Sequence, residues 1–147
     1  MLSDDFRDFL RLLNQHQVRY LVVGAYAVAA HGYPRNTGDI DIWIERSPEN
    51  ARKMVTVLAD FGFGSQGLTS GDFATPRSEI QLGHPPNRVD LLTDVSGISF
   101  ADCYEERIEK RLDGITVPFV GRECLRRAKL AAGRSQDRAD LENLGLL

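Results

Sequence analysis

Three aspartates in two short apolar segments are the residues of this sequence best suited to do chemistry. Asp39 and Asp41 flank a single isoleucine, and side chains alternate along a strand, so both carboxylates are expected on one face. Asp90 lies in a second apolar segment, where an unpaired charge would be costly. If the segments pair, the three carboxylates converge and repel one another unless a cation lies between them. Such oxygen ligands suit Mg²⁺, and two such ions would support an in-line phosphoryl displacement.

The same aspartates also have a purely structural interpretation. Two aspartates separated by one residue are common, and Asp39 follows a glycine, so it also fits a turn or a helix cap. Asp41 and Asp90 also fit ion pairs, with Arg35 or Arg88 as the partner. The wider pattern favours the metal site, because a strand and a glycine turn precede the aspartate pair on the next strand.

Helices and strands are expected to alternate along the chain. Apolar residues at helical spacing, with Ser3 and Ser47 as N-caps, predict helices, and β-branched apolar runs predict strands. Residues 62–76 are expected to be loop, and the Asp113-Gly114 pair is expected to turn a hairpin. The expected helices are 3–16, 25–30, 48–61, 121–132 and 136–146, and the expected strands are 20–23, 40–44, 78–82, 88–93, 105–112 and 115–120. This order predicts a single α/β (α+β) domain over residues 1–147, with a mixed β-sheet flanked by helices.

Composition and charge exclude several classes of protein. The chain has 18 basic and 21 acidic residues, a formal net charge of -3, which excludes a generally basic nucleic-acid coat but not a local basic patch. No apolar run approaches the roughly 20 residues that span a bilayer, and the acidic, amphipathic start is not expected to be a secretory signal. Cys103 and Cys124 lack the spacing of a zinc module or a disulfide scaffold, which favours a reducing cytoplasm.

The stretch from Gly24 to Asp41 resembles the nucleotidyltransferase superfamily, in which a strand and a small-residue turn precede two aspartates on the next strand. It is most similar to the small AbiE-type (AbiEii-like) toxin nucleotidyltransferases of bacteria, and the likeness extends over residues 15–145. The matching residues are Val23, Gly24, Ala27, His31, Gly32, Arg35, Thr37, Asp39, Ile40, Asp41 and Ile42, followed near the C-terminus by Lys129, Ala131, Ala132, Gly133, Arg134, Asp137, Asp140 and Leu141.

This resemblance implies a nucleotidyltransferase fold, an NTP substrate and Mg²⁺ as the cofactor. It implies that Asp39, Asp41 and Asp90 are the catalytic metal ligands, and that Asp90 could also orient or deprotonate the acceptor hydroxyl. The implied nucleotide-binding residues are Gly24, Ala25, Arg35, Thr37 and Lys129. Ala25 stands where the superfamily usually has serine or glycine, so only its backbone N–H remains for a phosphate.

Structural alternatives stand beside these roles. Arg35 also fits a surface loop, and Thr37 a turn. Lys129 lies on an expected helix whose basic residues also fit a solvated face, although the resemblance favours contact with phosphates. His31 is expected to stabilise a helix end, and Trp43 to be a core residue rather than a stacking partner for a base.

Two functions therefore compete. The first is transfer of a nucleoside monophosphate from an NTP to a hydroxyl of a tRNA, a protein or a small molecule, in a toxin–antitoxin or phage-defence system. The basic segment 122–134 is the best local surface for tRNA. The second is a non-catalytic antitoxin or regulatory binding module, which Ala25 favours and the three aspartates oppose. A homodimer or a partner protein is compatible with so small a domain, and a membrane partner is not expected.

Overall fold

A six-stranded mixed sheet forms the centre of the computed structural model, which describes residues 2–34, 36–64 and 67–147. Its strand order is β3-β4-β2-β1-β6-β5. The strands are β1 (Tyr20–Val23), β2 (Asp39–Ile44), β3 (Glu79–Leu82), β4 (Arg88–Leu92), β5 (Ile108–Leu112) and β6 (Ile115–Phe119). Strand β2 runs antiparallel to β1 and parallel to β4, while β1 runs parallel to β6. The predicted mixed sheet is therefore confirmed.

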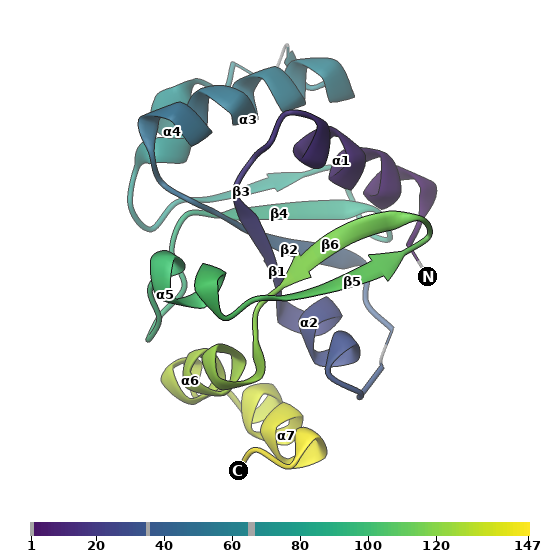
Figure 1. Cartoon of the computed structure of the whole chain (residues 1–147), viewed down its shortest axis with the longest axis vertical. Coiled ribbons are helices and arrows are strands. Elements are labelled where there is room, and N and C mark those ends of the chain that lie inside the picture. Colours follow the sequence, from purple (N-terminus) through teal and green to yellow (C-terminus); the bar gives the residue numbers. More distant parts are fainter. Residues whose placement is uncertain (1, 35, 65–66) are drawn as a thin grey trace.

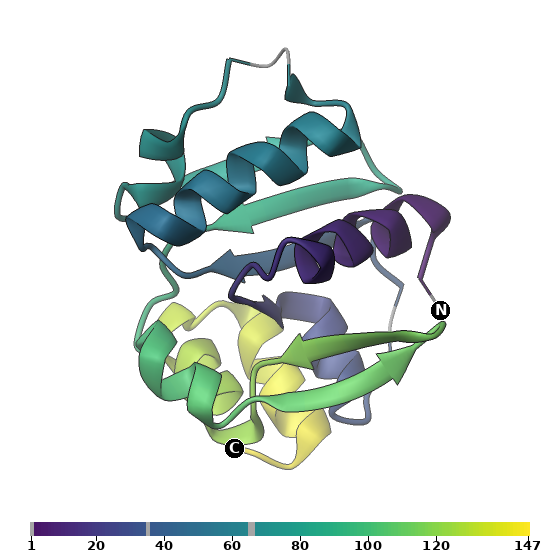
Figure 2. The same ribbon diagram turned by 45° about the horizontal axis from the view of Figure 1, so that its top comes forward.

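Helices cover both faces of this sheet, as Figures 1 and 2 show. They are α1 (Asp4–Gln15), α2 (Gly24–Ala30), α3 (Pro48–Phe61), α4 (Ser70–Ala74), α5 (Phe100–Glu105), α6 (Arg122–Ala132) and α7 (Ser135–Leu144). In both views α1, α3 and α4 lie on one side, and α2, α6 and α7 lie on the other. Within the described ranges, no helix has both the length and the apolar character needed to cross a membrane.

Local signals in the sequence set several element boundaries. The Ser3 hydroxyl accepts a hydrogen bond from the Phe6 N–H at 3.2 Å, and Ser47 accepts one from Asn50 at 3.1 Å, so both predicted N-caps are confirmed. On β2, Ile40 and Ile42 are buried in the core, which leaves the alternate positions for polar side chains.

Two short helices were missed by the sequence analysis. The predicted loop 62–76 contains α4, which begins with a capping box between Thr69 and Asp72. Helix α5 ends at Glu105, so the strand predicted over 105–112 begins only at Ile108. Helices of five or six residues are too short to show an amphipathic period, which is the signal that the longer helices give.

The cysteines form a pair that was not expected from the sequence, whose spacing argued against a disulfide scaffold and favoured a reducing cytoplasm. The structure pairs Cys103 of α5 with Cys124 of α6 in a disulfide, with the Cα atoms 5.9 Å apart. Both residues are buried. Their separation of 21 residues matches no sequence motif, because the packing of α5 beside the start of α6 is a tertiary contact.

Candidate functional site

The pairing of β2 with β4 brings the three aspartates together. In the parallel register Asp41 lies opposite Asp90, and oxygen atoms of Asp39, Asp41 and Asp90 all lie within 4.8 Å of one another. We call these three residues the carboxylate trio. Their predicted convergence on one face of two neighbouring strands is confirmed.

Gly24 brings the backbone against the carboxylate trio at the point where β1 passes into α2. Its φ is +68°, a left-handed conformation that side chains rarely adopt. A Cβ atom at this position would overlap Oδ2 of Asp41. Both the backbone angle and the absence of a side chain are therefore required for the turn to lie against Asp41.

Arg88 is the functional-site residue that the sequence analysis considered only as an ion-pair partner. Its Nε donates to Asp90 Oδ1 at 2.9 Å, and its Nη2 donates to Asp90 Oδ2 at 3.0 Å and to Asp39 Oδ2 at 2.8 Å. The Thr37 hydroxyl donates to the other Asp39 oxygen at 2.7 Å. The two-residue spacing of Arg88 and Asp90 on one strand was the available signal, since it places both on the same face.

The surroundings drive the pKa values of the carboxylate trio apart. Burial, with the nearby charges of Asp39 and Asp90, raises the pKa of Asp41 to about 7. Burial also raises the pKa of Asp90, and the hydrogen bonds from Arg88 oppose that rise. For Asp39 burial acts in the same direction, but hydrogen bonds with Thr37, Asp90 and Arg88 outweigh it and hold its pKa below the usual value.

These observations fit a divalent cation. The trio offers carboxylate oxygens, the ligand type that Mg²⁺ prefers, and its members lie close enough to share ions. The raised pKa of Asp41 records the cost of holding a third negative charge there without a cation. A bound Mg²⁺ would remove that cost.

A cavity of about 260 Å³ opens beside Asp41, and we call it the Asp41 cavity. Gly24, Asp41 and Glu79 line the side formed by the sheet, and Lys129, Arg134 and Asp137 line the side formed by α6 and α7. The acidic side chains of the sheet thus lie across the cavity from two cations and the carboxylate of Asp137 that pairs with both of them.

Lys129 faces this cavity, but its charge is already compensated within the chain. Its buried ammonium contacts Asp137 at 3.1 Å and Asp140 at 2.9 Å. Arg134 contacts Asp137 at 2.8 Å and leaves 76% of its side chain exposed. Lys129 therefore ties α6 to α7, and its predicted contact with phosphates stays a prediction.

The other nucleotide-binding candidates lie around a second, larger cavity. Ala25, Tyr26, Thr37, Lys110 and Phe119 are among the residues that line this space of about 700 Å³, which we call the Thr37 cavity. The predicted set is thus divided, with Gly24 and Lys129 on the Asp41 cavity and Ala25 and Thr37 on the Thr37 cavity. Arg35, the remaining candidate, lies outside the described residues.

The structure confirms that Trp43 is a core residue and that His31 lies at a helix end, while a role of the His31 side chain in stabilising that end stays a prediction. His31 follows the last residue of α2, and its Nε2 lies 2.8 Å from the carbonyl oxygen of Val120. Trp43 is buried and packs edge-on against Phe100, with ring centroids 5.2 Å apart.

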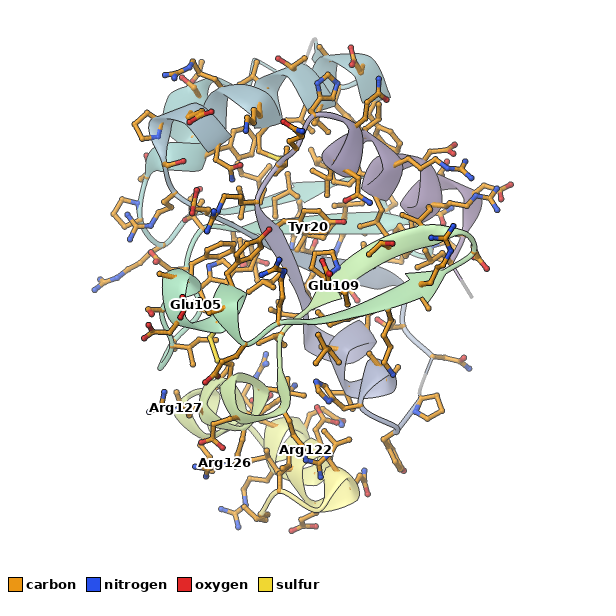
Figure 3. The ribbon with its side chains drawn as sticks, viewed as in Figure 1. Tyr20, Glu105, Glu109, Arg122, Arg126 and Arg127 are labelled. Carbon is orange, nitrogen blue, oxygen red and sulfur yellow. A yellow bond between two sulfur atoms is a disulfide. The ribbon has the colours of Figure 1, made fainter. Side chains whose placement is uncertain are left out.

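Three arginines of α6 form ion pairs or hydrogen bonds with other residues of the same chain. Figure 3 shows Arg122, Arg126 and Arg127 on this helix. Arg126 and Arg127 pair with Glu123 at 2.9 and 3.9 Å, and Arg122 donates to the Leu144 carbonyl at 2.6 Å. The local basic patch expected from the sequence is therefore partly neutralised.

Comparisons with known proteins show the fold and the family of the chain. A structure from Thermotoga maritima, described as a "putative nucleotidyltransferase", is 18% identical and has a TM-score of 0.64; the match covers 94% of this chain and 88% of that one. A search of curated proteins gave no match. The sequence model of a family described as "Nucleotidyltransferase of unknown function (DUF6036)" matches residues 3–147. The fold is shared with the Thermotoga protein, and the chain belongs to this nucleotidyltransferase family.

Proposed function

We propose that the protein is a Mg²⁺-dependent nucleotidyltransferase that moves a nucleoside monophosphate from an NTP to an acceptor hydroxyl. The observation that carries this proposal is the carboxylate trio, whose oxygens meet within 4.8 Å beside a cavity with cations on its far wall. Three aspartates brought together by neighbouring strands are costly without a cation, so their function as metal ligands explains their position.

Asp39, Asp41 and Asp90 would hold the metal. When bound, Mg²⁺ would lower the pKa of the attacking hydroxyl and offset the charge that develops on the phosphate oxygens. Asp90 is the candidate general base of the chain, since its carboxylate could accept the proton of the acceptor hydroxyl. Both of its oxygens accept hydrogen bonds from Arg88, so this role requires Arg88 to move.

The nucleotide phosphates fit the Asp41 cavity better than the Thr37 cavity. Arg134 pairs with Asp137 but keeps 76% of its side chain exposed, so its guanidinium can reach a phosphate, and Lys129, whose charge is compensated within the chain, lines the same cavity. The backbone of Gly24 lies at the start of α2, next to Asp41, and Ala25 follows it on the side of the Thr37 cavity. Thr37 acts indirectly in this proposal, because its hydroxyl orients Asp39.

The acceptor and the biological role belong to the same proposal. A protein or small-molecule hydroxyl is favoured over a tRNA end, because Arg122, Arg126 and Arg127 are engaged within the chain. A toxin–antitoxin or phage-defence role rests on the resemblance to AbiE-type proteins, and a homodimer or partner protein could complete the open site. A cytoplasmic location rests on the supply of NTP there, since the cysteine pair does not support it.

A non-catalytic binding module is the second candidate function. Arg88 neutralises two members of the carboxylate trio without a metal, and Ala25 offers no hydroxyl to a phosphate. An antitoxin or regulatory module would use the fold and leave the aspartates as parts of an ion-pair network.

Thermal shift with NTP, in the presence and absence of Mg²⁺, separates the two functions. The enzyme should gain stability from NTP only when Mg²⁺ is present, and the variant Asp39→Asn with Asp41→Asn should lose that gain. The matched control is Asp8→Asn with Asp60→Asn, which removes the same charge from α1 and α3. Transfer of label from an NTP to total tRNA or to lysate then identifies the acceptor, and reproducible silence with both favours the binding module.

A further inference from the structure

Arg88 occupies the carboxylate oxygens that a metal ion would use. It hydrogen-bonds both oxygens of Asp90 and one oxygen of Asp39, at 2.8 to 3.0 Å. The second oxygen of Asp39 is engaged by Thr37. Every carboxylate oxygen of Asp39 and Asp90 therefore already accepts a hydrogen bond from a residue of the same chain.

The guanidinium also serves the stability of the fold. The Asp90 side chain is only 3% exposed, and a buried carboxylate without a partner is costly. Arg88 itself is 28% exposed, so its side chain has access to solvent at one edge of the site. Arg88 can thus compensate the charge of Asp90, and its guanidinium can also move away from Asp90 into solvent without passing through the core.

A guanidinium and a divalent cation cannot both hold these oxygens at full strength, because two positive charges only a few ångströms apart repel each other. We propose that Arg88 is the internal counter-ion of the carboxylate trio, and that a divalent cation must displace it from Asp39 and Asp90 in order to bind. This inference rests on the metal site of the proposed function. It makes Arg88 a positioning residue that sets the metal affinity.

Two opposite effects of removing Arg88 follow. Without metal, Arg88→Gln leaves Asp39 and Asp90 without their counter-ion, so the chain should melt at a lower temperature. With metal, the ion no longer competes with the guanidinium, so it should bind more tightly. A residue that only supported the fold would lower the melting temperature and would not tighten metal binding.

Calorimetric titration of Mn²⁺ into the whole chain measures the competition directly, without any turnover. We expect the Kd of Arg88→Gln for Mn²⁺ to be at least about tenfold lower than that of the unchanged protein. The Kd of Arg88→Lys should lie between them, since lysine keeps the positive charge but lacks the bidentate N–H donors of the guanidinium. Arg46→Gln is the matched control, because Arg46 pairs with Asp94 at 3.3 Å with similar exposure outside the trio. Its Kd should not change.

Nuclear magnetic resonance tests the displacement in the unchanged protein, even if Arg88→Gln fails to fold. The Arg88 Nε–H signal, identified by its loss in Arg88→Lys, should move toward that of a free arginine as Mg²⁺ is added. An unmoved signal at saturating Mg²⁺ overturns the inference.

The failures of the inference and of the proposed function are distinguishable. If the unchanged protein and Arg88→Gln bind Mn²⁺ equally well, the inference is wrong and the metal site stands. If Arg88→Gln alone binds, the inference is supported in its strongest form. If neither binds, both the metal site and the inference are wrong.

Discussion

The backbone of Gly24 lies so close to the Asp41 carboxylate that a Cβ atom at residue 24 would overlap Asp41 Oδ2. The turn between β1 and α2 and the second aspartate of β2 are therefore one structural unit. A motif that reads in the sequence as a glycine followed much later by two aspartates is a direct contact in space.

Gly24→Ala should destabilise the chain and damage the site together. The left-handed backbone costs about 1–2 kcal/mol for a residue with a side chain, and relief of the overlap must shift Asp41 as well. Chemical denaturation should show a loss of about 2–4 kcal/mol, and Mn²⁺ should bind more weakly.

Gly145→Ala is the matched control for this change. Gly145 has a φ of +72°, close to the +68° of Gly24, but a Cβ there would have nothing within 4 Å. Gly145→Ala should lose only the free energy of unfolding that the left-handed backbone costs, and its affinity for Mn²⁺ should not change. Equal losses in both variants would mean that the contact with Asp41 has no energetic role.

Metal-free stability should fall as pH rises from about 4 to about 7. Asp41 has a pKa near 7 in the folded chain against 3.8 for an ordinary aspartate, so the folded state keeps a proton that the unfolded state has lost. The contribution of Asp41 is present below pH 3.8 and is lost as pH passes 7. Urea denaturation between pH 4 and pH 8 measures this slope, and Asp41→Asn should flatten it.

Added Mg²⁺ should reverse this dependence. The metal binds the ionised carboxylate, so its affinity should increase as pH rises through 7 and Asp41 loses its proton. Thermal shift at fixed Mg²⁺ should therefore grow from pH 6 to pH 8. Removal of the metal by a chelator should restore the falling profile, and a shift that is constant with pH would contradict the assignment of Asp41 as a ligand.

Lys129→Met should be among the more destabilising single changes on α6. It removes the ammonium that contacts the buried Asp137 and Asp140, and the loss of one partner of a buried pair costs about 3–5 kcal/mol. Arg126→Ala breaks an exposed pair with Glu123, which solvent screens, and should therefore cost much less. Equal effects in denaturation would mean that the cluster between α6 and α7 is not structural.

Reduction of the disulfide should lower the melting temperature of the protein and leave the carboxylate trio assembled. Cys103 and Cys124 are 21 residues apart, and closing a loop of that size is worth about 3 kcal/mol in the chain-entropy account. Melting with and without dithiothreitol measures the effect. The double variant Cys103→Ala with Cys124→Ala should not respond to the reductant, while an unchanged melting temperature of the parent protein would show that the disulfide does not contribute.

Most of the local structure, and the face on which Asp39 and Asp41 lie, could be predicted from the sequence. Ser3 and Ser47 could be assigned as caps because capping depends on residues three positions away. Asp39 and Asp41 could be placed on one face because alternation in a strand is a property of the backbone.

Which side chains meet in space could not be predicted, because it depends on how the elements pack. The register of β2 on β4 places Asp90 opposite Asp41 and lets Arg88 donate hydrogen bonds to both Asp39 and Asp90. The packing of α6 and α7 gives Lys129 two aspartates as partners, although the family resemblance favoured phosphate. Contacts of this kind depend on how whole elements pack, and burial decides whether a charge needs a partner, so neither can be obtained from the spacing of residues along the chain.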